Sequence, residues 1–333
     1  MKITASLQNR VAYQKTITLK KATRQFFEEK NYLELDLPLL SPALIPESYL
    51  EVFETTFRYF KESQKLYLTP SPELFIKRLL VEGIGDCYFL GKAFRNSEPE
   101  SSLHLPEFTI LEFYKTGVDY TYMKKELKEF VCFLAEKQKK KHIVYKNRSI
   151  ALDTVWQELT VKEAFSRYAD IADIFDETAF FTKAAEKGYA TENTSYVDLF
   201  SQVYAQEVEP HLGVAAPTII YDYPKKLAAL AQLKTDGVTA ERFELYIAGV
   251  ELADCYSELT DWKKQKERFK QDALLRKREG KINHPIDWGF IDALRKGLPK
   301  CAGVAVGFDR LAMLFAGATS LRQLQLIAFD RDM

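Results

Sequence analysis

Two apolar segments joined by a polar loop constrain the fold of this chain more than any other feature. The segments are residues 87–90 and 108–114. Arg95 stands at the entrance of the loop, and His104 and Phe108 stand at its exit. An arginine neutralises phosphate, a histidine can reach a terminal phosphate, and an aromatic ring can stack on a base. The pattern therefore predicts either a nucleotide-binding strand pair or an ordinary hairpin with a solvated loop.

A second segment near the C-terminus, residues 303–314, favours the nucleotide interpretation. Its small and β-branched residues predict a buried strand, and Leu311 and Leu314 follow with helical spacing. Arg310 then falls in the first turn of a helix, where the helix dipole disfavours a cation. This position is explained if an anion docks there, because backbone N–H groups and an arginine can bind phosphate together.

The charge balance and the cysteines limit the classes of function. The 333 residues include 47 basic and 47 acidic side chains, so the chain lacks the broad basic field that wrapping a long nucleic acid requires. Cys87, Cys132, Cys255 and Cys301 show no Cys-x-x-Cys spacing, which is typical of buried thiols in a reducing cytosol. No apolar run is long enough to span a bilayer, and we expect a cytoplasmic protein.

The hydrophobic pattern predicts interleaved helices and strands. Helices are expected at 8–30, 122–141 and 262–278, and strands at 33–37, 53–60, 65–69, 217–221 and within 242–258. Ser71, Pro72 and Glu73 predict the start of another helix, and Thr160 with Glu163 predicts a capping box. Mixed, mostly antiparallel strands with interleaved helices make the expected fold class α+β.

These segments resemble the catalytic core of the class II aminoacyl-tRNA synthetases. Residues 94–108 resemble motif 2 of that class, residues 303–310 resemble motif 3, and residues 26–38 resemble motif 1, the dimerising element. Within the class, three segments resemble the sequences of lysyl-tRNA synthetases. These segments are residues 71–79, 106–112 and 257–261. The resemblance extends from about Ala22 to the C-terminus.

The position of the motif 1-like segment distinguishes between members of the class. A lysyl-tRNA synthetase carries an anticodon-binding barrel before its catalytic domain, and here this segment begins too close to Met1 for such a barrel. The chain resembles freestanding paralogues that attach (R)-β-lysine to a lysine side chain of elongation factor P. We therefore expect a class II synthetase catalytic domain over 1–333, with a mainly helical insertion at about 119–215 and no anticodon-binding domain.

The resemblance implies an ATP-dependent ligase that activates a carboxylate as its adenylate. Arg95 would bridge the α-phosphate and the carboxylate, Arg310 would hold the γ-phosphate, and both are the expected catalytic residues. Phe108 would stack on adenine, and His104 would contact the terminal phosphate or, on the alternative view, be a solvated loop residue. The ATP-binding residues implied are Arg95, Asn96, His104, Phe108, Glu251, Leu252, Gly307 and Arg310.

The resemblance also implies where the amino acid binds. Glu112, Tyr114 and Glu258 would surround the distal ammonium of lysine, which would also neutralise a buried glutamate. Ser71 and Glu73 would receive the other amino group. Ala305 stands where lysyl-tRNA synthetases carry glycine, and its methyl group on the pocket floor would suit a β-amino group.

Glu244 and Glu251 are the candidate magnesium ligands. If Ala248 and Gly249 form a two-residue hairpin loop, Tyr246 pairs with Glu251 and Glu244 lies diagonally beside it on the same face. Two adjacent carboxylates repel, and Mg²⁺ bridging ATP phosphates would separate them, whereas the alternative is a solvated strand face. Glu258 has the opposite strand parity to Glu251, so both can face one site only if a bulge falls between them, near 254–255.

The implied partners are elongation factor P as the protein acceptor and a second copy of the chain in a homodimer, and tRNA is not expected. Three positions depart from the family pattern. Ser97 replaces Glu, with Glu98 next to it, and Leu105 and Asp254 each replace Asn. Two other functions stay open: a truncated lysyl-adenylate synthase with tRNA or another acceptor, and a non-catalytic regulatory paralogue.

Overall fold

The computed structural model describes residues 2–97 and 101–328, so Glu98 lies outside the described residues. The chain divides into two compact units, and each is described here by itself. The first unit comprises residues 2–117, 259–301 and 305–328 of the described chain. The second unit comprises residues 118–258 and 302–304.

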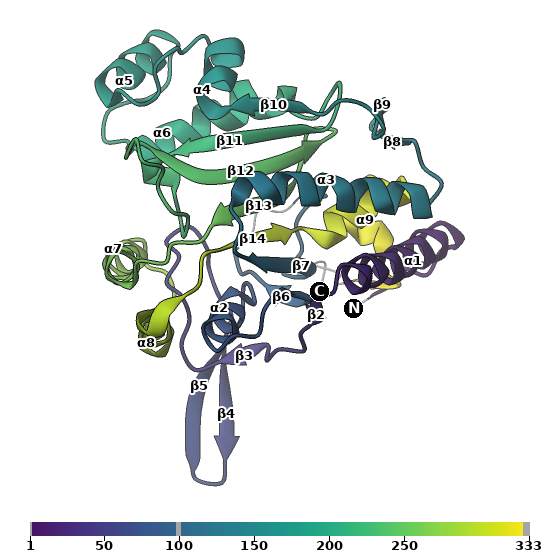
Figure 1. Ribbon diagram of the computed structural model, residues 1–333, viewed down its shortest axis with the longest axis horizontal. Helices are drawn as coiled ribbons and strands as arrows, with labels where there is room; N and C mark the ends of the chain where they lie inside the picture. Colours follow the sequence, from purple (N-terminus) through teal and green to yellow (C-terminus); the bar gives the residue numbers. More distant parts are fainter. Residues whose placement is uncertain (1, 98–100, 329–333) are drawn as a thin grey trace. The chain divides into compact units, whose positions relative to one another are not determined.

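The first unit contains both helices and β-strands, among them the long β4–β5 ribbon (Figure 1). Its helices are α1 (Leu7–Glu29), α2 (Glu73–Val81), α7 (Trp262–Arg278), α8 (Trp288–Gly297), α9 (Phe308–Ala316) and the 3₁₀ turn η5 (Leu321–Leu324). Its strands are β1 (Lys2–Ile3), β2 (Leu33–Glu34), β3 (Leu40–Ser41), β4 (Glu54–Tyr59), β5 (Glu62–Leu68), β6 (Cys87–Phe94), β7 (Glu107–Thr116) and β15 (Ile327–Ala328). Strand β14 (Cys301–Val306) has residues in both units.

The second unit contains the remaining elements. Its helices are α3 (Tyr120–Lys137), α4 (Val161–Ala164), α5 (Glu177–Glu186), α6 (Tyr196–Val203), the π-helices η1 (Phe165–Ala169) and η2 (Tyr204–Val208), and the 3₁₀ turns η3 (Glu209–His211) and η4 (Lys225–Leu227). Its strands are β8 (His142–Tyr145), β9 (Arg148–Ala151), β10 (Gln157–Thr160), β11 (Thr218–Pro224), β12 (Thr239–Ile247) and β13 (Val250–Ser257).

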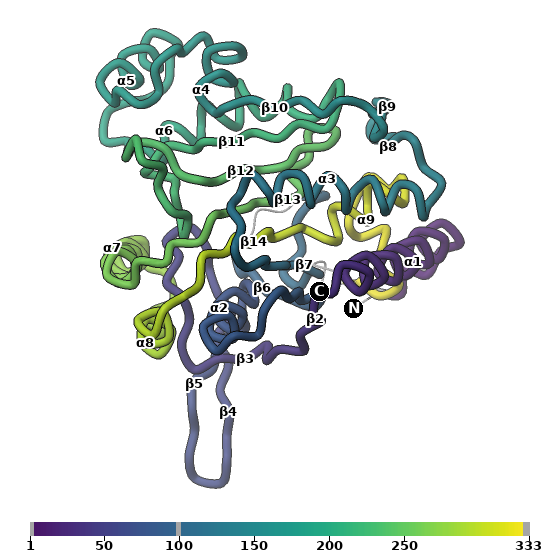
Figure 2. The backbone as a smooth tube through the Cα atoms, viewed as in Figure 1, coloured from purple at the N-terminus to yellow at the C-terminus, as the bar shows by residue number. Residues whose placement is uncertain are grey.

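Strands run in mixed directions in both units, which confirms the α+β class. In the first unit β6 and β7 are antiparallel, and β2 runs parallel to β6. In the second unit β10 runs parallel to β11, and β11, β12 and β13 follow in antiparallel order. The pair β1 and β15 brings residues 2–3 beside residues 327–328 (Figure 2).

The strongest sequence patterns are confirmed by the structure. The three long helices predicted from periodicity are α1, α3 and α7, and α7 has the predicted bounds. Thr160 and Glu163 form the predicted capping box, in which each side chain binds the backbone N–H of the other residue. The two apolar segments around the polar loop are strands β6 and β7, in the register that pairs Ala93 with Phe108.

Two predicted elements differ from the structure. The strand predicted at 33–37 is regular only over Leu33–Glu34, because only this stretch pairs with β6 before Pro38 ends it. The strand pair predicted around residues 61–64 turns instead at Phe60 and Lys61, and β5 already begins at Glu62. Phe60 adopts a left-handed φ of 52°, which makes this tighter turn possible.

The segment at 119–215 contains short strands as well as helices, namely β8, β9 and β10. No helix in the described part of the chain is both long enough and apolar enough to cross a membrane.

Candidate functional site

Arg95 and Phe108 lie together at the ends of β6 and β7. The N–H of Arg95 donates to the carbonyl of Pro106 at 3.1 Å, which closes the neck of the loop. The Arg95 guanidinium lies over the Phe108 ring, 5.4 Å from its centroid. Among residues 2–97 and 101–328, nothing accepts a hydrogen bond from the buried Nε of Arg95. A buried guanidinium donor without an acceptor fits an anionic ligand.

Arg310 and His104 come together although 206 residues separate them. Gly307 caps α9, so Arg310 lies in its first turn as the sequence predicts. Arg310 Nη2 lies 2.9 Å from His104 Nε2, and Arg310 Nε donates to the carbonyl of Leu103 at 3.2 Å. The exit of the loop therefore carries a cation and an imidazole side by side, as a terminal phosphate would require.

Asn96 lies next to Arg95, but its side chain is engaged with the protein. Its Nδ2 donates to the carbonyl of Val52 at 3.3 Å, and its Oδ1 accepts the N–H of Ser97 at 2.8 Å. Its backbone N–H donates to the carbonyl of Glu51 at 2.9 Å. These bonds tie the end of β6 to the segment before β4, and the role of Asn96 in ATP binding stays a prediction.

Ser71, Glu73, Glu112 and Tyr114 form an acidic cluster in the first unit. Ser71 Oγ donates to Glu112 Oε1 at 2.6 Å, and Tyr114 Oη donates to Glu112 Oε2 at 3.3 Å. The N–H of Glu73 donates to Ser71 Oγ at 3.0 Å, which fixes the hydroxyl at the start of α2. The Glu73 carboxylate forms an ion pair with Lys77, one turn along the same helix. Ser71 thus joins Glu112, one predicted contact of the distal ammonium, to Glu73, a predicted contact of the other amino group.

Burial shifts the pKa of Glu112. The side chain is buried, and this desolvation raises its pKa to about 8, assisted by the nearby charge of Glu73. The bond from Ser71 and the charges of Arg95 and Lys77 oppose the shift. A carboxyl group with this pKa changes its charge easily when a cation binds next to it.

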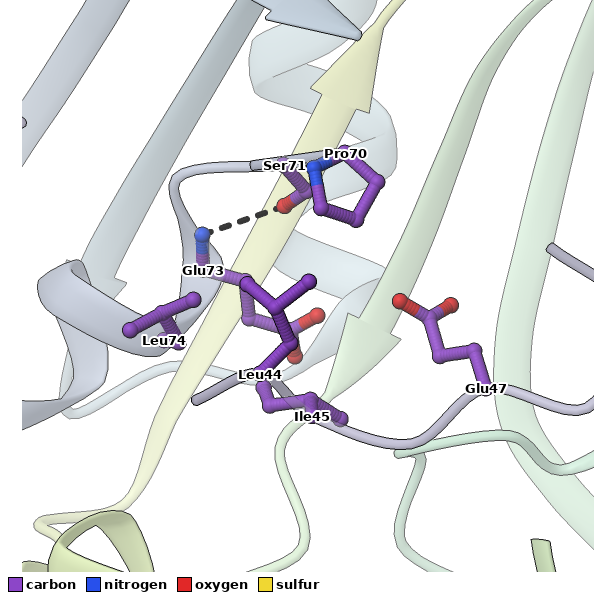
Figure 3. A pocket seen from close by; sticks show the side chains of 7 residues that line it. All are labelled: Leu44, Ile45, Glu47, Pro70, Ser71, Glu73 and Leu74. Atoms are coloured by element: carbon purple, nitrogen blue, oxygen red, sulfur yellow. Dashed lines mark hydrogen bonds between the residues drawn. The ribbon is translucent and has the colours of Figure 1, made fainter. Parts of the chain in front are cut away.

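A small cavity adjoins this cluster and contains an acid that the sequence analysis missed. Figure 3 shows the side chains of Glu47 and Glu73 directed into it, with Ser71 above them. Desolvation, assisted by the charge of Glu73, raises the pKa of Glu47 to about 7, and a hydrogen bond from Tyr49 opposes the shift. An isolated glutamate in a loop carries no periodic signal, so only the tertiary structure reveals it.

In the second unit, Arg242 lies between two of the acids on β12 and β13. Its Nη2 donates to Glu244 Oε1 at 2.7 Å, and its Nε and Nη2 each lie 3.0 Å from the Asp254 carboxylate. Tyr246 and Tyr256 donate to Glu244 and Asp254 at 2.8 and 2.6 Å. Arg242 is therefore the resident cation between these carboxylates, and their proximity does not by itself require a metal.

The hairpin that carries Glu251 has the predicted geometry. Ala248 and Gly249 form its two-residue loop with φ of 60° and 75°, and Tyr246 pairs with Glu251. The register shifts between Leu245 and Tyr246, which leaves Leu252 as the extra residue of a bulge. The expected bulge is therefore present at Leu252, not near 254–255, and it gives Glu251 and Asp254 a common face.

Glu244 is buried, and this desolvation raises its pKa. The charges of Glu251 and Asp254 raise it further, whereas Arg242 opposes the shift. Within residues 2–97 and 101–328, no group of three or more His, Cys, Asp or Glu residues could hold a metal ion. Mg²⁺ commonly takes one or two carboxylates together with substrate phosphates, so a pair of carboxylates fits it only when the nucleotide is bound.

The other predicted residues occupy defined positions. Leu252 is buried within β13. Glu258 is buried just beyond the end of that strand, where its backbone forms an isolated β-bridge with Ala231. Ala305 keeps accessible surface, although every other residue of β14 is buried. A residue on a pocket floor would show this pattern, and its role in choosing the isomer stays a prediction.

Residues 3–332 match the family described as tRNA synthetases class II (D, K and N). The chain is 36% identical over 315 residues to the elongation factor P–(R)-β-lysine ligase of Salmonella dublin, with 92% of each chain covered. The protein of the same name from Salmonella enteritidis PT4 shows the same identity and coverage.

Proposed function

Because this chain belongs to the class II tRNA synthetase family (D, K and N), we propose that it activates (R)-β-lysine with ATP and transfers it to a lysine side chain of elongation factor P. The relatives at 36% identity carry the name of this activity, and they match the chain over 92% of its length.

One observation carries the proposal: Arg95, whose buried Nε has no acceptor among the described residues, lies near enough to Glu112 and Glu47 for its charge to oppose the rise in pKa that burial causes in both. The arginine that would bind the reacting carboxylate is thus an electrostatic neighbour of acids that would bind ammonium groups. A diamino acid presents the complementary pattern, with a carboxylate at one end and ammonium groups along its chain. A buried carboxylate without a cation is costly, which favours such a substrate.

The reaction has two steps, in which this chain orients the reactants. A carboxylate oxygen of (R)-β-lysine attacks the α-phosphorus of ATP, and pyrophosphate leaves. Arg95 would draw the two anions together, while Arg310 and His104 would hold the terminal phosphate that departs with pyrophosphate. The amine of the acceptor lysine then attacks the adenylate carbonyl, an amide forms, and AMP leaves with the loss of one proton from the amine.

Phe108 would stack on adenine, and Asn96, Leu252 and Gly307 would complete the nucleotide contacts. Glu112, Tyr114 and Glu258 would bind the distal ammonium, and Ser71 and Glu73 would bind the other amino group. Glu244 and Glu251 would hold Mg²⁺, which supplies charge neutralisation to the phosphates when it is bound.

We also propose that two copies form a dimer through the motif 1-like segment, which offers the end of helix α1 and the short edge strand β2. An acceptor that is a translation factor would place the reaction in the cytoplasm. The membrane and tRNA take no part in the proposed reaction.

Mass spectrometry of elongation factor P tests the proposal. The purified acceptor is incubated with this protein, ATP, Mg²⁺ and (R)-β-lysine, and we expect a mass increase of one lysyl residue on one lysine. Omission of ATP or the Arg310→Ala variant serves as the control. Charging of tRNA without acceptor modification would favour the adenylate-synthase alternative, and no pyrophosphate exchange with any lysine isomer would favour the regulatory alternative.

A further inference from the structure

Glu47 is a third acid beside the two that the family resemblance assigns to amino-group binding. It lies in the loop between β3 and β4, and its side chain is directed into the small cavity that also contains Ser71 and Glu73 (Figure 3). The remaining four residues of the cavity wall are apolar. A carboxylate on such a wall gains stability when a cationic ligand occupies the space.

Carboxyl groups predominate around the cavity. The charges of Glu73 and Asp272 both raise the pKa of Glu47, whereas that of Arg95 opposes the shift, and Glu73 also raises the pKa of Glu112. Lys77 already pairs with Glu73, and Ser71 and Tyr114 already bind Glu112. An ammonium group of a lysine isomer in the cavity would favour the ionised form of Glu47.

Arg276 binds the backbone of the loop that carries Glu47. This buried arginine donates from Nη1 to the carbonyl of Glu47 at 2.8 Å and to the carbonyl of Leu50. Its Nη2 forms an ion pair with Glu51 at 3.0 Å. The Glu47 carboxylate in turn accepts a hydrogen bond from Tyr49 Oη at 2.6 Å. The backbone at Glu47 is therefore held by a buried arginine before any ligand binds, and the carboxylate is bonded to the exposed Tyr49.

We propose that Glu47 binds, together with Glu73, the ammonium group nearer the substrate carboxylate, and is a specificity-determining residue for diamino acids. The inference rests on the proposed function and adds one residue to it. Tyr49 would orient the carboxylate, and the apolar wall would exclude water and strengthen the charge contact.

The test is Glu47→Gln, which keeps the side-chain shape and removes the charge. Pyrophosphate exchange is measured with (R)-β-lysine and α-lysine, and 6-aminohexanoate, which lacks the nearer amino group, is measured as a competitive inhibitor. We expect KM for both lysine isomers to rise roughly 10- to 100-fold, the scale of one charged hydrogen bond. We expect KM for ATP and the inhibition constant of 6-aminohexanoate to stay within about twofold, since neither ligand uses this contact.

Glu62→Gln, at an exposed position of β5, is the matched control and should leave every constant unchanged. An active wild-type protein with an unchanged lysine KM in Glu47→Gln would overturn this inference alone. An equal rise in KM and in the 6-aminohexanoate constant would also overturn it, because a merely structural defect would weaken both. A wild-type chain silent with every lysine isomer would overturn the proposed function and this inference together.

Discussion

Arg310 donates a hydrogen bond from Nη2 to Nε2 of His104 at 2.9 Å. A guanidinium has no acceptor, so Nε2 must be the acceptor and the imidazole proton must lie on Nδ1. That proton can be donated to Ser101 Oγ, which lies 2.6 Å away. The contact therefore orients His104 next to the cation that would hold a phosphate, and its Nδ1–H is the donor that could turn from Ser101 to that phosphate.

Removal of the Arg310 cation tests this arrangement. We expect Arg310→Ala to reduce pyrophosphate exchange by at least about 100-fold, because a charged donor to the phosphates is lost. Lys15→Ala is the control, since it removes an exposed cation that also contacts the end of α9 through the carbonyl of Ala316. Circular dichroism should show both variants folded, and retained exchange in Arg310→Ala would refute the role.

The titration of Glu112 makes substrate binding depend on pH. With a pKa raised by burial to about 8, Glu112 is largely protonated at neutral pH, and an ammonium ligand favours its ionised form. Lysine binding should therefore release protons and strengthen as the pH rises from 6 to 8. Calorimetry in two buffers of different ionisation enthalpy measures the release, which should fall in Glu112→Gln.

The same shift affects the stability of the ligand-free chain. Glu112 binds its proton more tightly in the folded state, so its contribution to the free energy of unfolding is greatest at low pH. This contribution is lost as the pH rises from about 4.5 towards about 8. Urea denaturation at several pH values should show a smaller decline in Glu112→Gln, and an identical decline would contradict the assignment.

Arg242 stabilises the second unit through its contacts with Glu244 and Asp254. Replacement by methionine leaves two poorly solvated carboxylates without their cation, and we expect a loss of about 3–5 kcal/mol in the free energy of unfolding. Lys226→Met is the control, because its ion pair with Glu177 is exposed and should contribute at most about 1 kcal/mol. Equal losses in the two variants would refute this difference.

Ala305 offers a test of isomer choice. If its methyl group occupies the space that an α-amino group needs, Ala305→Gly should improve the use of α-lysine relative to β-lysine by about tenfold, the scale of one methylene in a fitted pocket. Adenylation assays with each isomer measure the ratio. An unchanged ratio would mean that Ala305 only packs in β14.

Dimerisation through the motif 1-like segment predicts a sedimenting species of twice the chain mass of 38.4 kDa. The measurement is made at micromolar protein concentration. A species of the chain mass alone would refute the dimer without affecting the proposed chemistry.

Local sequence patterns predicted the parts of the site that neighbouring residues determine. The strand pair β6 and β7, the first-turn position of Arg310 and the hairpin at Ala248 and Gly249 follow from periodicity, helix dipoles and turn chemistry. Each of these features depends on residues a few positions apart, so it can be predicted from the local sequence.

The tertiary structure decided which charged groups share an environment. Three features depend on contacts between separate segments. They are the position of Glu47 beside Glu73, the position of Arg242 between two acids, and the bulge at Leu252. The energy of a charge depends on its desolvation and on neighbours a few ångströms away in space. The sequence alone thus determined the family and the nucleotide motifs, whereas folding determined the electrostatics of the proposed amine pocket.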